Sequence, residues 1–163
     1  MAQHTNSLAG LPEQIDSYEV DASIRKDLIA LTNEAFKFEY LRSVLTNVPL
    51  KKDVSGDVIL PYPIEPIPDD SRIASAMVLL GYWGDTNAIP LLVSYITYES
   101  HVVRSNHSSW ANPAIDALVA IGEPAVPSLL QVFSETNSTR LLMTSVSLKL
   151  IKRWDYWSFE AAP

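Results

Sequence analysis

The chain has 163 residues, of which 47% are hydrophobic, and this composition fits one folded domain of ordinary size. The absence of cysteine excludes disulfides, thiolate catalysis and cysteine-ligated metal sites. The formal net charge is −7, with 19 acidic against 12 basic side chains, which is the opposite of the basic footprint of proteins that bind nucleic acids or anionic membranes.

Neither a membrane span nor a leader is expected. No apolar run approaches the ~18–20 residues that a spanning helix requires. Residues 1–10 have neither the basic start nor the apolar stretch of a signal peptide. We therefore expect a cytoplasmic protein, the alternative being an exported protein whose signal peptide precedes this sequence.

Residues 1–20 are polar and without periodicity, and they predict a flexible N-terminal lead-in to a single α-helical domain over 21–163. Asp21 stands where the N-cap of a helix is expected. The apolar spacing that follows predicts either two helices or one kinked helix over 22–46, with Asn33 at the break.

Residues 47–70 predict an extended, proline-rich arm. Proline lacks an amide donor and forces the preceding residue out of the α-helical region. The prolines concerned are Pro49, Pro61, Pro63, Pro66 and Pro68. Asp69 and Asp70 close the arm, and we expect them to cap the next helix.

The next segment predicts a helical hairpin. A short amphipathic helix over 71–80 is followed by a turn over 81–87 and a second helix over 88–98, with Pro90 in its first turn. Gly81 and Gly84 allow positive φ where the chain reverses. Asp85 can cap the second helix.

The same unit then recurs. Asn112 caps a helix over 113–121, a turn at 122–124 follows, and a partner helix begins at 125, so that Pro127 stands 37 residues after its counterpart Pro90. Helical hairpins repeating at about 30–47 residues indicate an α-solenoid. A further helix over 140–153 and an aromatic tail over 154–159 follow. We expect 22–46 to cap one end of the array and the tail to fold over the other.

Two segments carry a resemblance to a known family of repeats. Residues 80–92, from Leu80 to Leu92, resemble the turn of phycobilisome-lyase-type HEAT-like repeats, and residues 117–130 resemble its shorter form. The resemblance covers about residues 71–153. It implies an all-α, short α-solenoid of HEAT-like hairpins, interrupted by the proline-rich loop. It also implies that the second helix of each hairpin lines a concave surface, where Tyr95 and Tyr98 would lie.

The remaining candidates for contact with a partner lie in turns and linkers. The linker after the first hairpin holds two histidines six residues apart, which match no standard metal spacing, together with an arginine and a tryptophan, which often anchor interfaces. An ordinary inter-repeat loop is the alternative for this linker, and packing against a neighbour is the alternative for Trp83. The candidate interaction surface comprises Trp83, Tyr95, Tyr98, His101, Arg104, His107 and Trp110.

No motif of catalysis is present. The chain has no Gly-x-Ser-x-Gly elbow and no glycine-rich phosphate loop, so we predict no catalytic, cofactor-binding or metal-binding residues. We expect a protein-interaction module or scaffold whose acidic N-terminal half favours a basic partner, such as an inhibitor or immunity-type antidote to a basic toxin.

Two alternatives remain open. The first is a small-molecule or tetrapyrrole-binding, lyase-like protein with an apolar pocket between 88–98 and the arm, lined by Tyr62, Tyr95 and Tyr98. The second is a piece of a longer repeat array, with the aromatic tail as the contact to a further repeat.

Overall fold

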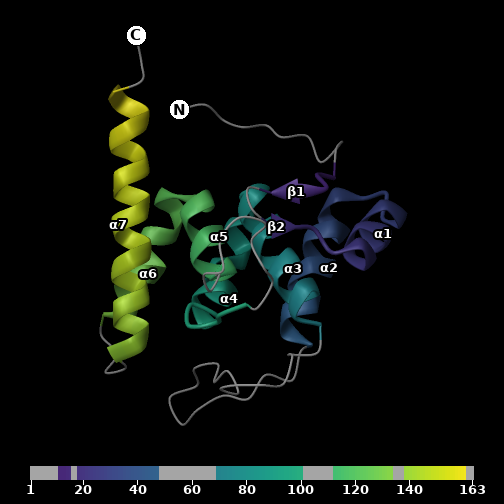
Figure 1. The fold of residues 1–163 in the computed structure, drawn as a ribbon, viewed down its shortest axis with the longest axis horizontal. Coiled ribbons are helices and arrows are strands. Elements are labelled where there is room, and N and C mark those ends of the chain that lie inside the picture. Colours follow the sequence, from purple (N-terminus) through teal and green to yellow (C-terminus); the bar gives the residue numbers. More distant parts are fainter. Residues whose placement is uncertain (1–10, 16–17, 48–68, 101–111, 134–137, 161–163) are drawn as a thin grey trace.

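The computed structural model describes residues 11–15, 18–47, 69–100, 112–133 and 138–160, and these residues are mostly helical (Figure 1). The prediction of an all-α protein is therefore confirmed at the level of fold class. The helices are α1 (Ala22–Ala30), α2 (Glu34–Thr46), α3 (Asp70–Tyr82), α4 (Ile89–Ser94), α5 (Pro113–Ile121), α6 (Val126–Val132) and α7 (Ser138–Glu160). The proline-rich arm falls almost entirely on residues 48–68, which lie outside the described part.

The N-terminal segment is folded in residues 11–15 and 18–20. Two short antiparallel strands, β1 (Gln14–Ile15) and β2 (Tyr18–Glu19), lie against α3. Ile15, Tyr18 and Val20 are buried, and the Tyr18 hydroxyl donates to the Asp116 carboxylate of α5 at 2.6 Å. The predicted lead-in is thus wrong for residues 11–15 and 18–20, because these three apolar side chains cover the core helices.

The break between α1 and α2 follows from local capping. The Asp21 carboxylate accepts the amides of Ser23 and Ile24, and the Asn33 side chain accepts the amide of Ala35. Leu31, at the end of α1, is extended, so the chain leaves the helix before Asn33 starts the next one. Of the two predicted forms of 22–46, the pair of separate helices is the one observed.

The turns of the two hairpins have most of the predicted features, namely glycines with positive φ and a capping aspartate. Gly84 and Gly122 have positive φ, at 68° and 78°, and Asp85 caps the 3-10 turn (Thr86–Ala88) that leads into α4. Gly122 likewise precedes a 3-10 turn (Glu123–Ala125) and α6. The helix α4 ends at Ser94, four residues before its predicted end.

Gly81 has a different role from the one predicted. It lies inside α3 and is buried, and a Cβ placed on it would come 2.5 Å from the Cα of Ala117 in α5. The residue therefore allows α3 and α5 to approach closely and does not reverse the chain. The small side chains of Ala76, Ala88 and Ala125 are also fully buried, as expected for closely packed helices.

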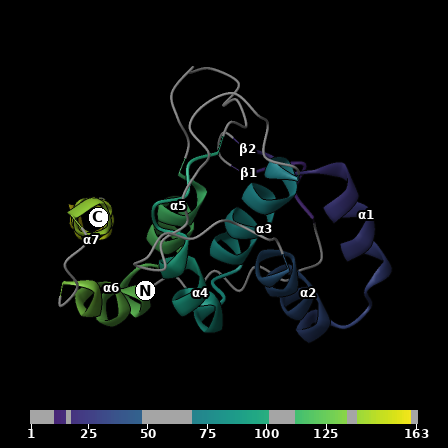
Figure 2. The same cartoon turned by 90° about the horizontal axis from the view of Figure 1, so that it is seen from below.

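The helices form two rows. Seen from below, α1, α3, α5 and α7 lie in one row and α2, α4 and α6 in the other (Figure 2). The helix α3 is central, because nine of its residues are buried and it contacts α1, α2, α5 and both strands. The helices α1 and α2 lie at one end of the rows, and α6 and α7 at the other (Figure 1).

Two details at helix ends differ from expectation. Asp69 occupies the N-cap position of α3 but has a φ of 64° and makes no side-chain capping bond. Asp70, in the first turn, accepts hydrogen bonds from the hydroxyls of Tyr98 and Ser100. At the other end of the chain, the aromatic tail does not fold back over the array, because residues 154–159 continue α7 as one uninterrupted helix to Glu160.

Candidate interaction surface

Two of the predicted surface residues, Tyr95 and Tyr98, lie in the hydrophobic core. They are 5% and 0% exposed, and their rings meet edge-on with centroids 6.1 Å apart. The Tyr95 hydroxyl donates to the carbonyl oxygen of Leu45, and the Tyr98 hydroxyl donates to the Asp70 carboxylate. Burial raises the pKa of both hydroxyls, so each remains a neutral donor. Their assignment to an exposed surface is therefore wrong, because core packing and internal partners occupy both side chains.

Trp83 serves mainly as a contact between the first hairpin and the N-terminal helices. It follows α3 directly and is partly buried, and its ring meets the ring of Phe38 in α2 edge-on, with centroids 6.1 Å apart. This geometry matches the alternative in which Trp83 packs against a neighbouring element. The remaining predicted residues, His101, Arg104, His107 and Trp110, lie outside the described residues.

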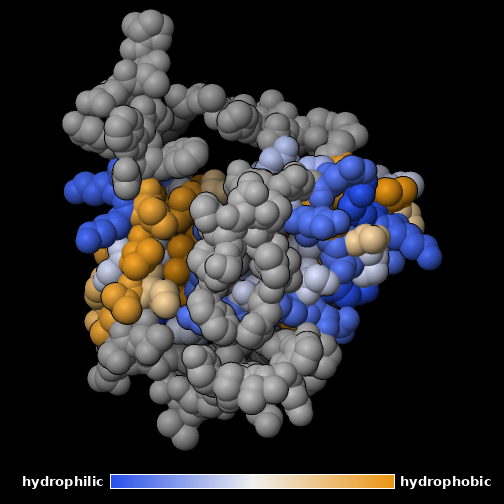
Figure 3. Space-filling model, viewed as in Figure 1, coloured by the Kyte–Doolittle hydropathy of each residue, from blue (hydrophilic) through white to orange (hydrophobic). Residues whose placement is uncertain are grey.

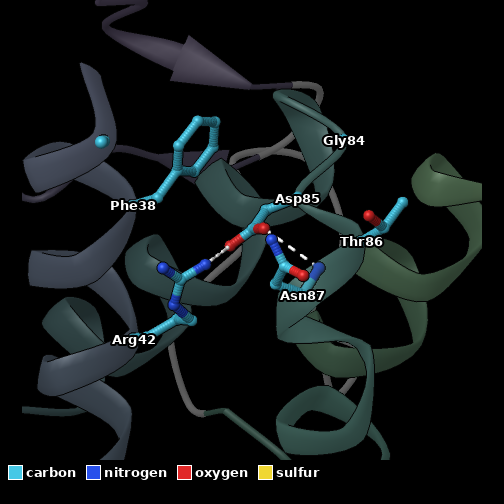
Figure 4. Close-up of a pocket in the computed structure, with 7 residues that line it drawn as sticks. Phe38, Arg42, Gly84, Asp85, Thr86 and Asn87 are labelled. Carbon is cyan, nitrogen blue, oxygen red and sulfur yellow. Dashed lines mark hydrogen bonds and ion pairs between the residues drawn. The ribbon is translucent and has the colours of Figure 1, made fainter.

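An open hollow of about 330 Å³ lies between α2 and the turn of the first hairpin (Figure 4). Arg42 points across it to Asp85, and a guanidinium nitrogen lies 2.5 Å from a carboxylate oxygen. The other Asp85 oxygen accepts the Asn87 amide at 3.1 Å. The Asp85 side chain is only 5% exposed, so the charge of Arg42 is used to balance a buried carboxylate. This ion pair fastens α2 to the hairpin and leaves little charge to recognise a ligand.

A second hollow, of about 360 Å³, is lined by Tyr40, Asp69 and Arg72, among others. The Tyr40 hydroxyl donates to Asp27 at 2.5 Å and accepts from Arg72 at 3.1 Å. Burial, followed by the hydrogen bond to Asp27, raises the pKa of Tyr40 to about 12, so this phenol is not a base at neutral pH. Neither hollow is the predicted apolar pocket, since Tyr95 and Tyr98 line neither of them and Tyr62 lies outside the described residues.

The structure describes no group of three or more metal-ligating side chains within 11–15, 18–47, 69–100, 112–133 and 138–160. The hydrogen-bonded carboxylates in these segments connect elements of the fold: Asp21 joins α1 to α3, Asp116 joins α5 to β2, and Asp70 joins α3 to the segment after α4. These carboxylates therefore have structural partners within the fold.

The most unusual surface belongs to α7. Three residues face the rest of the protein and are buried, namely Thr144, Ser147 and Ile151, which we call the inner row. Three large aliphatic residues face solvent, at 61%, 38% and 38% exposure, namely Leu142, Val146 and Leu150, which we call the outer row. Successive residues of a helix are rotated by ~100°, so the outer row lies on a different side of α7 from the inner row, with Leu142 farthest from the inner row and Leu150 nearest to it.

The inner row is the more polar of the two. The Ser147 hydroxyl donates to the Met143 carbonyl of its own helix at 3.0 Å, whereas the Thr144 hydroxyl is buried and has no hydrogen-bond partner among the described residues. A buried hydroxyl without a partner costs about 1–3 kcal/mol. The helix α7 therefore buries two hydroxyls together with Ile151 and packs the partly buried Met143 and Leu148 against the core, while three aliphatic side chains are exposed to solvent.

The helix α6 adds to this apolar surface. It packs against α7 and exposes Leu130 and Phe133 at 53% and 48%. Figure 3 shows hydrophobic residues gathered over the α7 end of the molecule, with hydrophilic residues beside them. We call the outer row together with Leu130 and Phe133 the apolar end face. Isolated exposed apolar residues are common on monomeric proteins, whereas interaction sites have several of them grouped together.

The sequence contained part of the signal for this surface. The spacing of Leu142, Val146 and Leu150, at i, i+4 and i+8, predicts one face of a helix. It does not indicate which face is turned inward, because Leu141 and Leu148, seven residues apart, offer another apolar face on the same helix. The burial of Thr144 and Ser147 decides the question, and this depends on tertiary contacts with α5 and α6.

Comparison with known proteins gives no relative, since no family model, curated protein or solved structure matches this chain. Among the described helices, none is by itself long and apolar enough to cross a bilayer; α5 and the segment Glu123–Val132 reach that length and apolarity only as a pair, bent by 112°.

Proposed function

We propose that this chain is a protein-interaction module built from HEAT-like helical hairpins, and that the apolar end face is its contact surface. Support for the repeat architecture comes from the two rows of helices and from the two hairpins, α3–α4 and α5–α6. Each of these hairpins has a glycine with positive φ, a 3-10 turn and a proline in the first turn of its second helix.

The observation that carries the proposal is the outer row of α7. Burying a Leu or Val side chain completely is worth about 1.5–3 kcal/mol. Three such side chains stand in one line on the exposed side of α7, and Leu130 and Phe133 stand on the neighbouring α6. A partner that covers this face would gain the free energy that the isolated chain leaves unused.

The proposal is tested by capture from a lysate of the source organism with three forms of the protein. The first is the wild type, and the second carries Val146→Glu, which places a charge in the middle of the outer row. The third carries Ile29→Glu, a matched control, because Ile29 is 68% exposed on α1 at the opposite end of the rows.

We expect the wild type and Ile29→Glu to capture the same partner protein in stoichiometric amount. Val146→Glu should not capture this partner. Far-ultraviolet circular dichroism checks that all three forms are folded. A partner retained by Val146→Glu would show that the contact surface lies elsewhere. The absence of any partner that depends on the outer row would remove the support for an interaction module at this face.

A further inference from the structure

We infer that the apolar end face binds an amphipathic helix of a partner protein, with an apolar stripe flanked by Asp and Glu. This inference rests on the proposed function and adds the chemistry of the partner to it. Its basis is the local charge of α7, which differs in sign from that of the whole chain.

The charged side chains among the described residues of α7 are all cationic. Residues 140–152 contain Arg140, Lys149 and Lys152 and no Asp or Glu, although the chain as a whole has a net charge of −7. Lys149 and Lys152 are exposed. Lys149 stands three residues after Val146 and adjoins the outer row, and Lys152 follows three residues later along the same edge of the helix. The helix α6 contributes no charge at all. An apolar contact surface with a basic edge favours partners that place Asp or Glu side chains opposite the lysines.

The expectation of a basic partner concerns the acidic N-terminal half and does not apply to the apolar end face. That expectation came from the net charge of the whole chain, whose acidic excess lies in residues 1–70. The electrostatic interaction between exposed groups is largely screened beyond about 8–10 Å. A partner bound to the apolar end face would therefore be affected mainly by Lys149 and Lys152.

The shape of the surface favours a helix as the occupant. The three residues of the outer row are four positions apart on a straight helix, so the row extends over about 12 Å and forms a ridge of the kind that packs into the groove of another helix. Leu130 and Phe133 are exposed on α6, which packs beside α7. An amphipathic helix with anchors at i, i+4 and i+8 has the complementary spacing.

A second copy of this chain is a poorer occupant. Two α7 helices packed through their outer rows would bring the lysines of both copies to the shared interface. Residues 140–152 offer no carboxylate to compensate for them. Like charges at an interface edge oppose association, so charge complementarity selects a different helix, one with acidic residues beside its apolar stripe.

The test uses three synthetic, fluorescently labelled helical peptides of the same length. All three have leucine at i, i+4 and i+8, and the residues that flank the leucines are glutamate in one peptide, glutamine in the second and lysine in the third. Binding is measured by fluorescence anisotropy to the full chain in three forms: the wild type, Val146→Glu, and the double variant Lys149→Glu with Lys152→Glu.

We expect the wild type to bind the glutamate peptide about threefold to tenfold more tightly than the glutamine peptide, as two exposed ion pairs would provide. The lysine peptide should bind most weakly, and high salt should reduce these differences. The double variant should prefer the lysine peptide, and Val146→Glu should weaken the binding of all three. Lys149 and Lys152 are exposed, so their substitution should leave the fold intact.

Two outcomes would overturn the inference. Equal binding of the three peptides, or a preference that the double variant leaves unchanged, would show that charge does not select the partner. Concentration-dependent dimerisation of the wild type in light scattering, abolished by Val146→Glu, would make a second copy the occupant. In both cases the proposed function survives if capture from the lysate depends on the outer row, and it fails separately if capture does not.

Discussion

Asp21 connects α1 to α3 through a single carboxylate. One oxygen accepts the amides of Ser23 and Ile24 at 2.9 and 3.2 Å, and the other accepts the Ser71 hydroxyl at 2.6 Å. Burial raises the pKa of this carboxyl, but the hydrogen bonds from Ser23, Ser71 and the Ile24 amide outweigh burial and hold it below the usual 3.8. The charged form is therefore the form that stabilises the fold.

Asp21→Ala should lower the free energy of unfolding by about 1–2 kcal/mol at neutral pH, as the loss of an N-cap usually does. Because the folded pKa lies below the unfolded value of 3.8, the contribution of the carboxylate is complete above that value and is lost as the pH falls through the folded pKa. Urea unfolding of both forms, at neutral pH and in acid, should show the difference narrowing in acid. A difference that is constant with pH would mean that the charge of Asp21 does not contribute.

Gly81 limits how closely α3 and α5 can pack. A Cβ at this position would lie 2.5 Å from the Cα and 2.8 Å from the carbonyl oxygen of Ala117, so the backbones would have to separate. Gly81→Ala should destabilise the protein by about 1–3 kcal/mol, although alanine is favoured over glycine in a helix by ~1 kcal/mol.

Gly84→Ala is the control for Gly81→Ala in chemical unfolding experiments. A Cβ at Gly84 meets no atom within 4 Å, so the substitution adds only the strain of a φ of 68°. That strain costs about 1–2 kcal/mol. If Gly81→Ala were neutral or stabilising, α3 and α5 would have to pack less closely than the structure shows.

At the scale of the elements, the orientation of α7 supports the functional proposal, and two substitutions test it. Thr144→Val removes a buried hydroxyl without a partner and keeps the shape of the side chain, so it should stabilise the protein by about 1 kcal/mol. Leu142→Ser affects a residue that is 61% exposed and should change the stability by less than about 0.5 kcal/mol.

Thermal and urea unfolding of these two variants would reveal a rotated helix. If the outer row faced the core, Leu142→Ser would be strongly destabilising and Thr144→Val nearly neutral. That pattern would remove the apolar end face together with the function proposed for it.

The elements that the sequence predicted correctly are those whose ends have local causes. Asp21, Asn33 and Asn112 start helices because their side chains accept amides from the first turn, and this chemistry can be recognised along the chain. Tyr95 and Tyr98 were misplaced because their burial depends on acceptors far along the chain, Leu45 and Asp70. Periodicity places residues on a common face but does not show what covers that face, which is also why the exposed row of α7 was not foreseen.

At the scale of the whole molecule, one hydrophobic cluster connects both ends of the rows. It extends from Ile15 beside β2, through α1 to α5, to Ile151 in α7. The Arg42–Asp85 ion pair adds a polar connection between α2 and the first hairpin. Because no described helix has a core of its own, the N-terminal helices and the hairpins should unfold together.

Ile24→Ala tests this cooperativity. Ile24 lies in α1 and is fully buried, so the substitution should cost about 2–5 kcal/mol. Native-state hydrogen exchange should show a loss of protection of similar size in α5, whose main contacts are with α3, α4 and α7. The reason is that the most protected amides exchange through global unfolding. Ile29→Ala is the matched control on the same helix, since Ile29 is 68% exposed and its loss should leave exchange in α5 unchanged.

If Ile24→Ala reduced protection in α1 but not in α5, the N-terminal helices would form a separate unit. The helices α1 and α2 could then unfold while the rest of the protein stays folded. The apolar end face on α6 and α7 would remain in place in either state.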